Sequence, residues 1–383
     1  MQVEYLVIGG SAAGITAANQ ILKVNPQAQL LCITAEQGRP YNKCWLVDWV
    51  SGERADDQLQ LVVHPNLQIW AGVRVSKLDV LQQIAYCDDG RQVSYQRVLL
   101  ATGVQSVQLP IVGVRLPHVF NFHTKLDAQR ILGWVESANV KQVVVIGAGL
   151  TGLEVADALG RIGLQVAVVD QFNRPLARQA DVAGSNYLLN LMKQAGILFL
   201  GDQQVSCITS EQVELASGKT IGADLVVLAV GARPNQIQIV GGDLVCDRGY
   251  VLVNQALQTS LPNIWAAGDL ILAPDLLTNQ LVSTCSWPDA VQQGRLAAQS
   301  MLGQVVDYAG MLPIAVTSLF GQDLVSCGNL MGENRFGEQI VSSYRKVTVG
   351  QDGLITGFLL IGEVGLYPQL RRAILANQRL DSL

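Results

Sequence analysis

Two glycine-rich turns, each set between an apolar strand and an apolar helix, most constrain how this 383-residue chain can fold. The first, Gly9 to Gly14 (GGSAAG), follows the β-branched run Val3 to Ile8, and the second, Gly147 to Gly152 (GAGLTG), follows Gln142 to Ile146. Such turns bring the N–H groups at a helix N-terminus against a pyrophosphate. Two of them predict two dinucleotide-binding units of parallel strands and helices, and therefore an α/β fold.

The first turn carries Ser11 where a glycine is usual. The next predicted strand, Gln29 to Thr34, leads to Glu36, which lies 22 residues past Gly14. A carboxylate at an offset of about 20 residues meets a ribose hydroxyl in dinucleotide-binding folds. We therefore predict that Glu36 binds the ribose of the first dinucleotide, the alternative being an ordinary loop charge.

The second turn has its own carboxylate. The strand Gln165 to Val169 ends at Asp170, 18 residues past Gly152. A carboxylate there accepts a free 2′-hydroxyl and repels a 2′-phosphate, which favours NADH over NADPH. Arg174 and Arg178 follow closely; they either grip a 2′-phosphate, contact the pyrophosphate or belong to a solvated basic loop.

Composition narrows the function class. A chain of this length predicts two or three domains. The net charge is -5 and no run of basic residues occurs, which argues against nucleic acid as a partner. No apolar run reaches the roughly 18 residues of a membrane span, and the N-terminus lacks a basic leader, so we expect no membrane insertion and a cytoplasmic protein. The seven cysteines and three histidines show no paired spacing, so we expect no disulfide framework and no metal.

Three further segments accompany the turns: Leu99 to Gly103 (LLATG), Val230 to Asn235 (VGARPN) and Thr259 to Asp269 (TSLPNIWAAGD). With them, nearly the whole chain resembles the FAD-containing pyridine-nucleotide disulfide oxidoreductase superfamily. The resemblance implies two Rossmann-like three-layer domains, one for FAD and one for NAD, and a small C-terminal α+β module. The implied boundaries are 1–111 with 245–303 for FAD, 112–244 for NAD and 304–383 for the module. In the module we predict strands near Thr317, Leu324, Ile340 and Val347, a hairpin turn at Asp352-Gly353, a strand from Leu354 to Ile361 and a final helix.

The resemblance also implies which residues contact the cofactors. The FAD candidates are Gly9, Ser11, Ala12, Ala13, Gly14, Glu36, Lys43, Ala101, Thr102, Gly103, Gly268, Asp269 and Trp287. The NAD candidates are Gly147, Gly149, Leu150, Thr151, Gly152, Glu154, Asp170 and Gly231.

Three of these candidates have an alternative role. Glu154 matches a family carboxylate beside the nicotinamide, or it is a first-turn residue stabilised by the helix dipole. Lys43 meets the flavin or its phosphates, or is solvated. Trp287 covers the flavin ring, or packs at the start of its helix.

The segment Tyr41 to Leu46 resembles two subgroups. Its Tyr-Asn-basic start is similar to the flavoprotein region of nitrite reductases and to rubredoxin and ferredoxin reductases, which pass electrons to a protein. In those, a proline often replaces Cys44 and Ser-Lys stands where this chain has Val47-Asp48. A single cysteine eight residues before a glycine, as Cys44 stands before Gly52, resembles NADH oxidases, NADH peroxidases and coenzyme A disulfide reductases.

Cys44 therefore has two interpretations. At a helix start beside Lys43, its thiolate would be favoured and the thiol would act as a redox centre. Alternatively it is a small packed side chain near the flavin. The lack of a close cysteine pair argues against glutathione-, lipoamide- and thioredoxin-type reductases.

We thus expect an FAD-dependent NAD(P)H oxidoreductase that takes hydride from NADH, with Cys44, Lys43 and Glu154 as catalytic candidates. Its expected acceptor is a small redox protein or a partner oxidoreductase subunit. The alternatives are a Cys44-dependent NADH oxidase or coenzyme A disulfide reductase, and a flavoprotein whose redox state controls assembly of a complex. A homodimer through the C-terminal module is expected by analogy with relatives.

Overall fold

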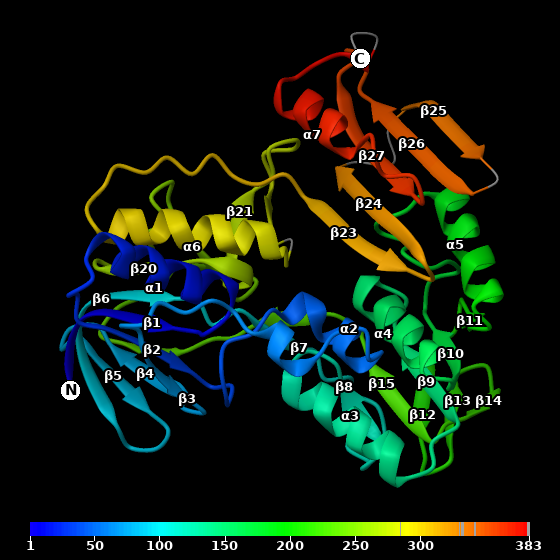
Figure 1. Ribbon diagram of the computed structural model, residues 1–383, viewed down its shortest axis with the longest axis horizontal. Helices are drawn as coiled ribbons and strands as arrows, with labels where there is room; N and C mark the ends of the chain where they lie inside the picture. Colours follow the sequence, from blue (N-terminus) through cyan, green and yellow to red (C-terminus); the bar gives the residue numbers. More distant parts are fainter. Residues whose placement is uncertain (284, 329, 331–332, 341, 381–383) are drawn as a thin grey trace. The chain divides into compact units, whose positions relative to one another are not determined.

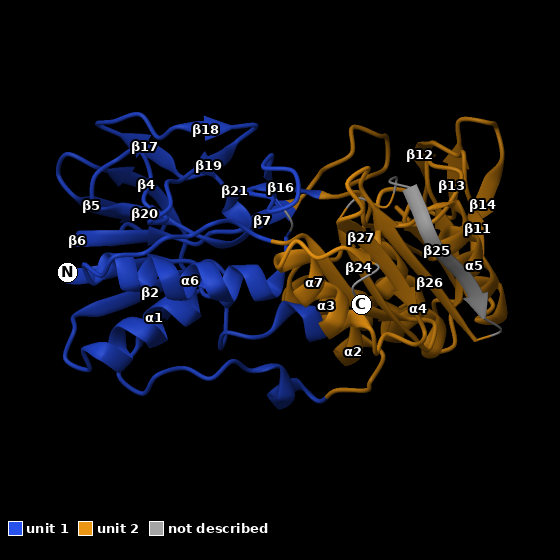
Figure 2. Cartoon of the chain, turned by 90° about the horizontal axis from the view of Figure 1, so that it is seen from above, with its two compact units in different colours: residues 1–45, 55–105, 232–311 blue, residues 46–54, 106–231, 312–383 orange. Residues whose placement is uncertain are grey.

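The computed structural model describes residues 1–283, 285–328, 330, 333–340 and 342–380, without the side chains of 333–340. The chain divides into two compact units, which Figure 2 colours separately. Unit 1 comprises residues 1–45, 55–105 and 232–311, and unit 2 comprises residues 46–54, 106–231 and 312–383. Within the described residues, no helix is both long and apolar enough to cross a membrane. The three-domain boundaries given above stay a prediction.

Unit 1 is built on a mixed sheet whose strands run in the order β17-β4-β5-β6-β1-β2-β3, with β20 also paired to β6. The neighbours of β1 on both sides are parallel to it, and β4, β5 and β6 form an antiparallel meander. The strands are β1 (Gln2–Ile8), β2 (Leu30–Thr34), β3 (Gln68–Ala71), β4 (Val75–Asp79), β5 (Ile84–Cys87), β6 (Gln92–Leu100), β17 (Gln238–Val240) and β20 (Ile264–Ala266).

Helices α1 (Ala12–Val24) and α6 (Trp287–Met301) pack against each other in unit 1 (Figure 1). Alanines of both helices, including Ala17, Ala18, Ala297 and Ala298, are fully buried, and their small side chains let the helices approach closely.

The other described elements of unit 1 are three 3-10 turns and six short strands. They are η1 (Lys43–Trp45), η2 (Asp56–Leu59), η3 (Gly268–Leu270), β7 (Val104–Ser106), β16 (Ala232–Pro234), β18 (Cys246–Asp247), β19 (Tyr250–Leu252), β21 (Ile271–Pro274) and β22 (Leu281–Val282).

Unit 2 contains a parallel sheet in the order β11-β10-β9-β15-β8 and a small antiparallel sheet β12-β13-β14. The central strands β9, β10 and β15 are Val-rich apolar runs that are buried after the first Gln of β9 and β10, as expected for a parallel sheet covered on both faces. The elements are α2 (Leu46–Val50), β8 (Val119–Asn121), α3 (Lys125–Ser137), β9 (Gln142–Ile146), α4 (Leu150–Arg161), β10 (Gln165–Val169), α5 (Val182–Gln194), β11 (Leu198–Leu200), β12 (Val205–Ile208), β13 (Gln212–Leu215), β14 (Thr220–Gly222) and β15 (Leu225–Leu228).

The C-terminal part of unit 2 is an antiparallel sheet in the order β23-β24-β27-β26-β25, followed by helix α7 (Figure 1). Its elements are β23 (Ile314–Leu319), β24 (Gln322–Gly328), β25 (Glu333–Ile340), β26 (Ser343–Val349), β27 (Ile355–Ile361) and α7 (Tyr367–Leu375). These elements agree with the strands and final helix predicted for the module. The hairpin before β27 turns at Gly353, which has a φ of 77°.

Two carboxylates, the buried Asp157 and the partly buried Asp181, connect this C-terminal sheet to helices of the parallel sheet. Asp157 on α4 accepts the backbone N–H of Phe320 at 3.0 Å and a guanidinium N–H of Arg161 at 2.7 Å. Asp181, the N-cap of α5, accepts the hydroxyl of Tyr344 at 2.9 Å and the ammonium of Lys346 at 3.0 Å. Because each carboxylate has hydrogen-bonding partners, the cost of removing its charge from water is offset.

The predicted α/β class is therefore confirmed, because each glycine-rich turn connects a strand with parallel neighbours to a helix.

Candidate functional site

Three loops of unit 1 meet at one edge of its sheet, because the parallel strands β1, β6 and β20 end there. The loops are the turn 9–14, the segment 101–103 and the turn that carries Gly268 and Asp269. Ala267 donates its N–H to the carbonyl of Leu100 at 3.0 Å, which joins two of the loops. Predicted FAD residues from three distant segments thus lie together at the carboxyl edge, where doubly wound folds bind ligands.

The first glycine-rich turn is packed too closely to accept side chains at its ends. Gly9 has a φ of 122°, and a Cβ there would lie 2.0 Å from the carbonyl oxygen of Ala101. A Cβ on Gly14 would lie 1.8 Å from the carbonyl oxygen of Gly9. Ser11, by contrast, has a φ of -115° in the extended region, so it replaces the usual glycine without backbone strain.

Helix α1 begins behind this turn without a side-chain cap among the described residues, Ser11 being its N-cap. The side chains of Thr124, Asp181 and Ser286 cap helices α3, α5 and α6. The first N–H groups of a helix have no partner within the helix and carry its positive dipole end. The uncapped start of α1 therefore fits a pyrophosphate.

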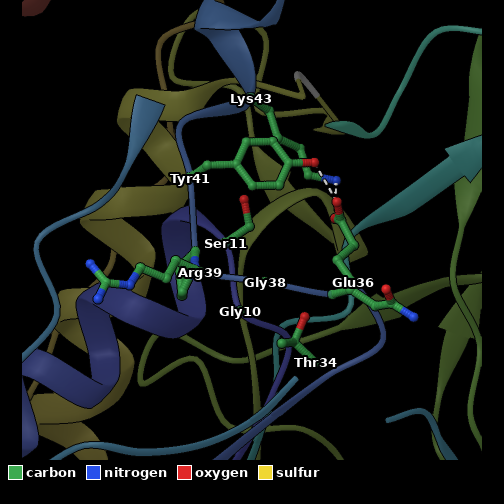
Figure 3. Close-up of a pocket in the computed structure, with 10 residues that line it drawn as sticks. Gly10, Ser11, Thr34, Glu36, Gly38, Arg39, Tyr41 and Lys43 are labelled. Atoms are coloured by element: carbon green, nitrogen blue, oxygen red, sulfur yellow. Dashed lines mark hydrogen bonds and ion pairs between the residues drawn. The ribbon is translucent and has the colours of Figure 1, made fainter. Parts of the chain in front are cut away.

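A pocket opens beside the N-terminus of α1 (Figure 3). Inside it, Glu36 accepts a hydrogen bond from the hydroxyl of Tyr41 and forms an ion pair with Lys43 at 2.8 Å. The pocket is lined by Gly10, Ser11, Thr34, Glu36, Gln37, Gly38, Arg39, Pro40, Tyr41 and Lys43. An ion pair as exposed as this one contributes about 0–1 kcal/mol, so a bound ribose or phosphate can replace it at small cost.

Lys43 also interacts electrostatically with the turn that carries Gly268 and Asp269. Burial raises the pKa of Asp269 to about 6, the positive charge of Lys43 opposes this shift, and Asp289 adds to it. Lys43 is thus electrostatically linked to both Glu36 and Asp269, two carboxylates that are more than 200 residues apart in sequence. The arrangement gives a candidate FAD site in which one cation interacts electrostatically with two carboxylates.

The other predicted residues of unit 1 have contacts of their own. Thr102 donates its hydroxyl to the carbonyl of Asn235 at 2.9 Å, and the Asn235 side chain returns a hydrogen bond to the carbonyl of Thr102. Trp287 begins α6 and is partly buried against the unit 1 core. Cys44 is exposed and lies in the one-turn 3-10 helix η1, which precedes the five-residue helix α2 in sequence. A dipole from so short a helix favours a thiolate less than the predicted helix start would.

Unit 2 repeats the arrangement with the NAD candidates. Strands β9, β10 and β15 are parallel, and Gly147 begins the turn by donating its N–H to the carbonyl of Val169 at 2.8 Å. A Cβ on Gly152 would lie 1.9 Å from the carbonyl oxygen of Gly147, so this glycine is required by packing. All FAD candidates lie in unit 1 and all NAD candidates lie in unit 2.

Gly149 differs from its neighbours in the turn. It is the N-cap of α4, has an ordinary φ of -77°, and gives the helix no side-chain cap. Apart from its two chain neighbours, no atom of the described residues comes within 4 Å of a Cβ placed on it. Since the protein's own packing leaves this space open, the turn fits a ligand whose pyrophosphate approaches the backbone closely.

Asp170 is held against the same turn. One of its carboxylate oxygens accepts the N–H of Ala148 at 2.5 Å, and the other accepts the N–H of Phe172 at 2.8 Å. The nearby basic side chains make contacts within their own loop. Arg174 donates to the carbonyl of Ala177 at 3.2 Å, and the guanidinium of Arg178 lies 5.6 Å from the ring centre of Phe172.

Glu154 lies on the first turns of α4 and contacts the C-terminal sheet. Its Oε1 accepts the hydroxyl of Thr317 on β23 at 2.5 Å. Burial raises the pKa of Glu154, the Thr317 hydrogen bond opposes this shift, and the charge of Asp48 adds to it. A carboxyl whose pKa is raised by burial is typical of functional sites.

Sequence reasoning did not single out Tyr41, Asn235 or Thr317 as site residues. Tyr41 belongs to the segment that was used for subgroup resemblance, and Asn235 ends the VGARPN segment, so a signal existed for both. Thr317 contacts a residue 163 positions away, which no local pattern reveals.

Comparison with known proteins places the chain among flavoprotein reductases. The family model described as pyridine nucleotide-disulphide oxidoreductase matches residues 3–294. The NADH-dependent phenylglyoxylate dehydrogenase subunit epsilon of Aromatoleum evansii is 28% identical over 377 residues, which cover 94% of this chain and 88% of that protein. The NADH oxidase of Methanocaldococcus jannaschii is 30% identical over 331 residues, which cover 82% of this chain and 73% of that protein.

The fold is shared with solved structures. The NAD-dependent persulfide reductase from A. fulgidus matches with a TM-score of 0.89 at 22% identity, covering 100% of this chain and 78% of that one. The resemblance predicted from the glycine-rich turns and the three accompanying segments is confirmed by these matches.

Proposed function

Because the chain belongs to the pyridine nucleotide-disulphide oxidoreductase family, we propose that it takes electrons from NADH through FAD and delivers them to a redox protein or a partner subunit. It is an oxidoreductase, and its cofactors are FAD and NAD(H). When bound, FAD accepts a hydride from the reduced nicotinamide and releases the electrons singly or in pairs.

The observation that carries this proposal is the repeated anion site. Helices α1 and α4 begin behind glycine-rich turns with no side-chain cap among the described residues, and each turn has a carboxylate after the next strand of the sheet. Glu36 and Asp170 are those carboxylates. We assign the FAD ribose to Glu36 and the NADH ribose to Asp170, because each lies at the offset where a ribose hydroxyl is bound.

NADH is the proposed electron donor over NADPH. Asp170 accepts backbone N–H groups at both oxygens, which holds its negative charge at the turn. A 2′-phosphate placed there would meet that charge, whereas a 2′-hydroxyl would donate to it. The contacts of Arg174 and Arg178 within their own loop support the same choice.

A protein acceptor is supported by one relative in particular. The phenylglyoxylate dehydrogenase chain is named as a subunit of an NADH-dependent enzyme, and it matches this chain over almost its whole length. Two of the three catalytic candidates have roles in this proposal: Lys43 neutralises anionic groups of FAD, and Glu154 orients the nicotinamide.

A second candidate function rests on Cys44, which is exposed and adjacent to Lys43. In that case the thiol would take part in the reaction, as in a coenzyme A disulfide reductase or a thiol-dependent NADH oxidase, and the relative from Methanocaldococcus jannaschii is named an NADH oxidase. A cytoplasmic location is part of the proposal, because none of the seven cysteines, all within the described residues, forms a disulfide.

An anaerobic titration with NADH decides between the two candidates. Wild type, Cys44→Ser and a matched control, Cys246→Ser, would be followed by the flavin absorbance and the electron pairs consumed. Cys246 is also exposed but lies on the short strand β18 of unit 1. One pair per FAD in all three proteins supports an external protein acceptor. Two pairs in wild type and Cys246→Ser, but one in Cys44→Ser, would establish Cys44 as a redox centre and overturn the leading proposal.

A further inference from the structure

Gln293 is a buried amide on helix α6, with 2% of its surface exposed. Its Oε1 accepts the backbone N–H of Gly268 at 2.7 Å, and its Nε2 donates to the hydroxyl of Tyr308 at 2.9 Å. Burying an amide is costly unless its polar atoms are hydrogen-bonded. These two bonds therefore fix both the position and the orientation of the side chain.

The N–H that Gln293 accepts belongs to the start of a turn. Gly268 is the first residue of η3, has a φ of 77°, and precedes Asp269. The first N–H groups of a helical turn have no partner inside it. No side chain at Ala267, the N-cap of η3, supplies one. Gln293 thus provides from α6 the cap that the turn itself lacks.

The same stretch of α6 contacts the first turn of α1, beside which it runs (Figure 1). A Cβ on Gly294 would lie 2.2 Å from the carbonyl oxygen of Ala13, and a Cβ on Gly268 would lie 3.1 Å from the Cβ of Ala13. The anion-binding start of α1, the η3 turn and α6 therefore converge at Ala13. Any displacement of η3 changes the distance between Asp269 and the α1 N-terminus.

We propose that Gln293 is a positioning residue for FAD, which sets the Gly268–Asp269 turn in register with the N-terminus of α1. Tyr308, itself 4% exposed, turns the amide so that the carbonyl oxygen of Gln293 faces Gly268. Gln293 does not touch the cofactor in this role; it acts through Asp269. The proposal rests on the assignment of the FAD site made above.

Three variants separate positioning from general stability. Gln293→Met keeps the volume and removes both hydrogen bonds. Gln293→Glu keeps a carbonyl oxygen for the Gly268 N–H, because burial favours the protonated acid. Tyr308→Phe removes only the group that orients the amide. Ser185→Ala is the matched control: the Ser185 side chain is fully buried on α5 and donates to the carbonyl of Pro175 at 2.8 Å, in unit 2.

Two measurements apply to each variant: the Kd for FAD added to the apoprotein, and amide hydrogen exchange of the segment 264–270 in the apoprotein. For Gln293→Met we expect both the Kd and the exchange rate to rise about 10-fold, as loss of a partner for a buried N–H predicts. Gln293→Glu should stay within about 3-fold of wild type, and Tyr308→Phe should raise both quantities about 3-fold. Ser185→Ala should change neither.

Clear results would overturn the inference. The inference is refuted if either Tyr308→Phe or Gln293→Met has the wild-type Kd for FAD and the wild-type exchange rate. The Tyr308→Phe test can be made even if Gln293→Met fails to fold. Equal losses in Gln293→Met and Ser185→Ala would show a general stability effect in place of positioning. Wild-type protein that binds no FAD would refute both the proposed function and this inference. Wild-type protein that binds FAD but reduces no acceptor would refute the proposed function and leave the inference standing.

Discussion

The two glycines Gly149 and Gly152 should respond oppositely to the same substitution, although they lie three residues apart. At Gly152 a new Cβ would lie 1.9 Å from the carbonyl oxygen of Gly147 and 3.3 Å from the Cβ of Ala229. Overpacking of this kind costs about 1–3 kcal/mol or more of unfolding free energy. Gly152→Ala should therefore destabilise the protein, as measured by urea unfolding.

Gly149→Ala should leave the fold intact and weaken NADH binding. The residue has an ordinary φ of -77°, and beyond its two chain neighbours no described atom lies within 4 Å of the new Cβ. An alanine there leaves stability unchanged or raises it by about 0.4–1 kcal/mol, because the unfolded chain becomes less flexible. The same Cβ would occupy the space that we assign to the pyrophosphate, so we expect the KM for NADH to rise about 10-fold, or about 1.4 kcal/mol.

The assay is NADH oxidation with ferricyanide as an artificial acceptor, fitted for KM and kcat beside urea unfolding of each variant. A wild-type KM in Gly149→Ala would refute the placement of NADH at this turn. Equal destabilisation of the two variants would refute the distinction drawn from the packing.

Three further outcomes follow from single contacts. Burial raises the pKa of Asp269 from 3.8 to about 6, so the folded protein holds this proton more tightly than the unfolded chain does. The unfolding free energy therefore falls by up to about 3 kcal/mol as pH rises from about 4 to about 6. In urea unfolding, Asp269→Asn apoprotein should be more stable than wild type above pH 6 and equal to it below pH 4. Thr317→Val removes a hydrogen bond that lowers the pKa of Glu154, so the Glu154 limb of the pH profile for flavin reduction should move to higher pH, whereas Thr317→Ser should keep it in place. Asp181→Ala leaves the buried Lys346 without its carboxylate and should lower the unfolding free energy by about 3–5 kcal/mol; no change in urea unfolding would contradict that reasoning.

Local patterns were sufficient to predict the strands and helices that adjoin the two glycine-rich turns. The strands predicted at Gln142 to Ile146 and Gln165 to Val169 have those bounds in the structure. The helices behind the two turns begin at Ala12 and Leu150. A glycine-rich turn between a β-branched run and an apolar helix is specified by neighbouring residues, so tertiary context seldom changes it.

The candidate sites were only partly predictable. Glu36 and Asp170 follow from a fixed offset along the chain, because the offset reflects one strand-helix-strand repeat. The ion pair of Glu36 with Lys43 and the hydrogen bond of Glu154 with Thr317 follow from no such offset. The predicted helix start at Cys44 proved to be a 3-10 turn, since helix boundaries depend on weak local preferences. The assigned roles of these residues stay predictions.

The sequence by itself determined the family, the α/β class and the two turns that could hold dinucleotides, because these depend on backbone geometry that glycine and β-branched residues specify within about 20 residues. Only the tertiary structure decided that Gly149 faces open space while Gly152 is packed, and that Gln293 caps the turn before Asp269. The physical reason is that steric contact and hydrogen bonding act over about 3 Å. Residues far apart in the chain reach that distance only after the sheets and helices have packed.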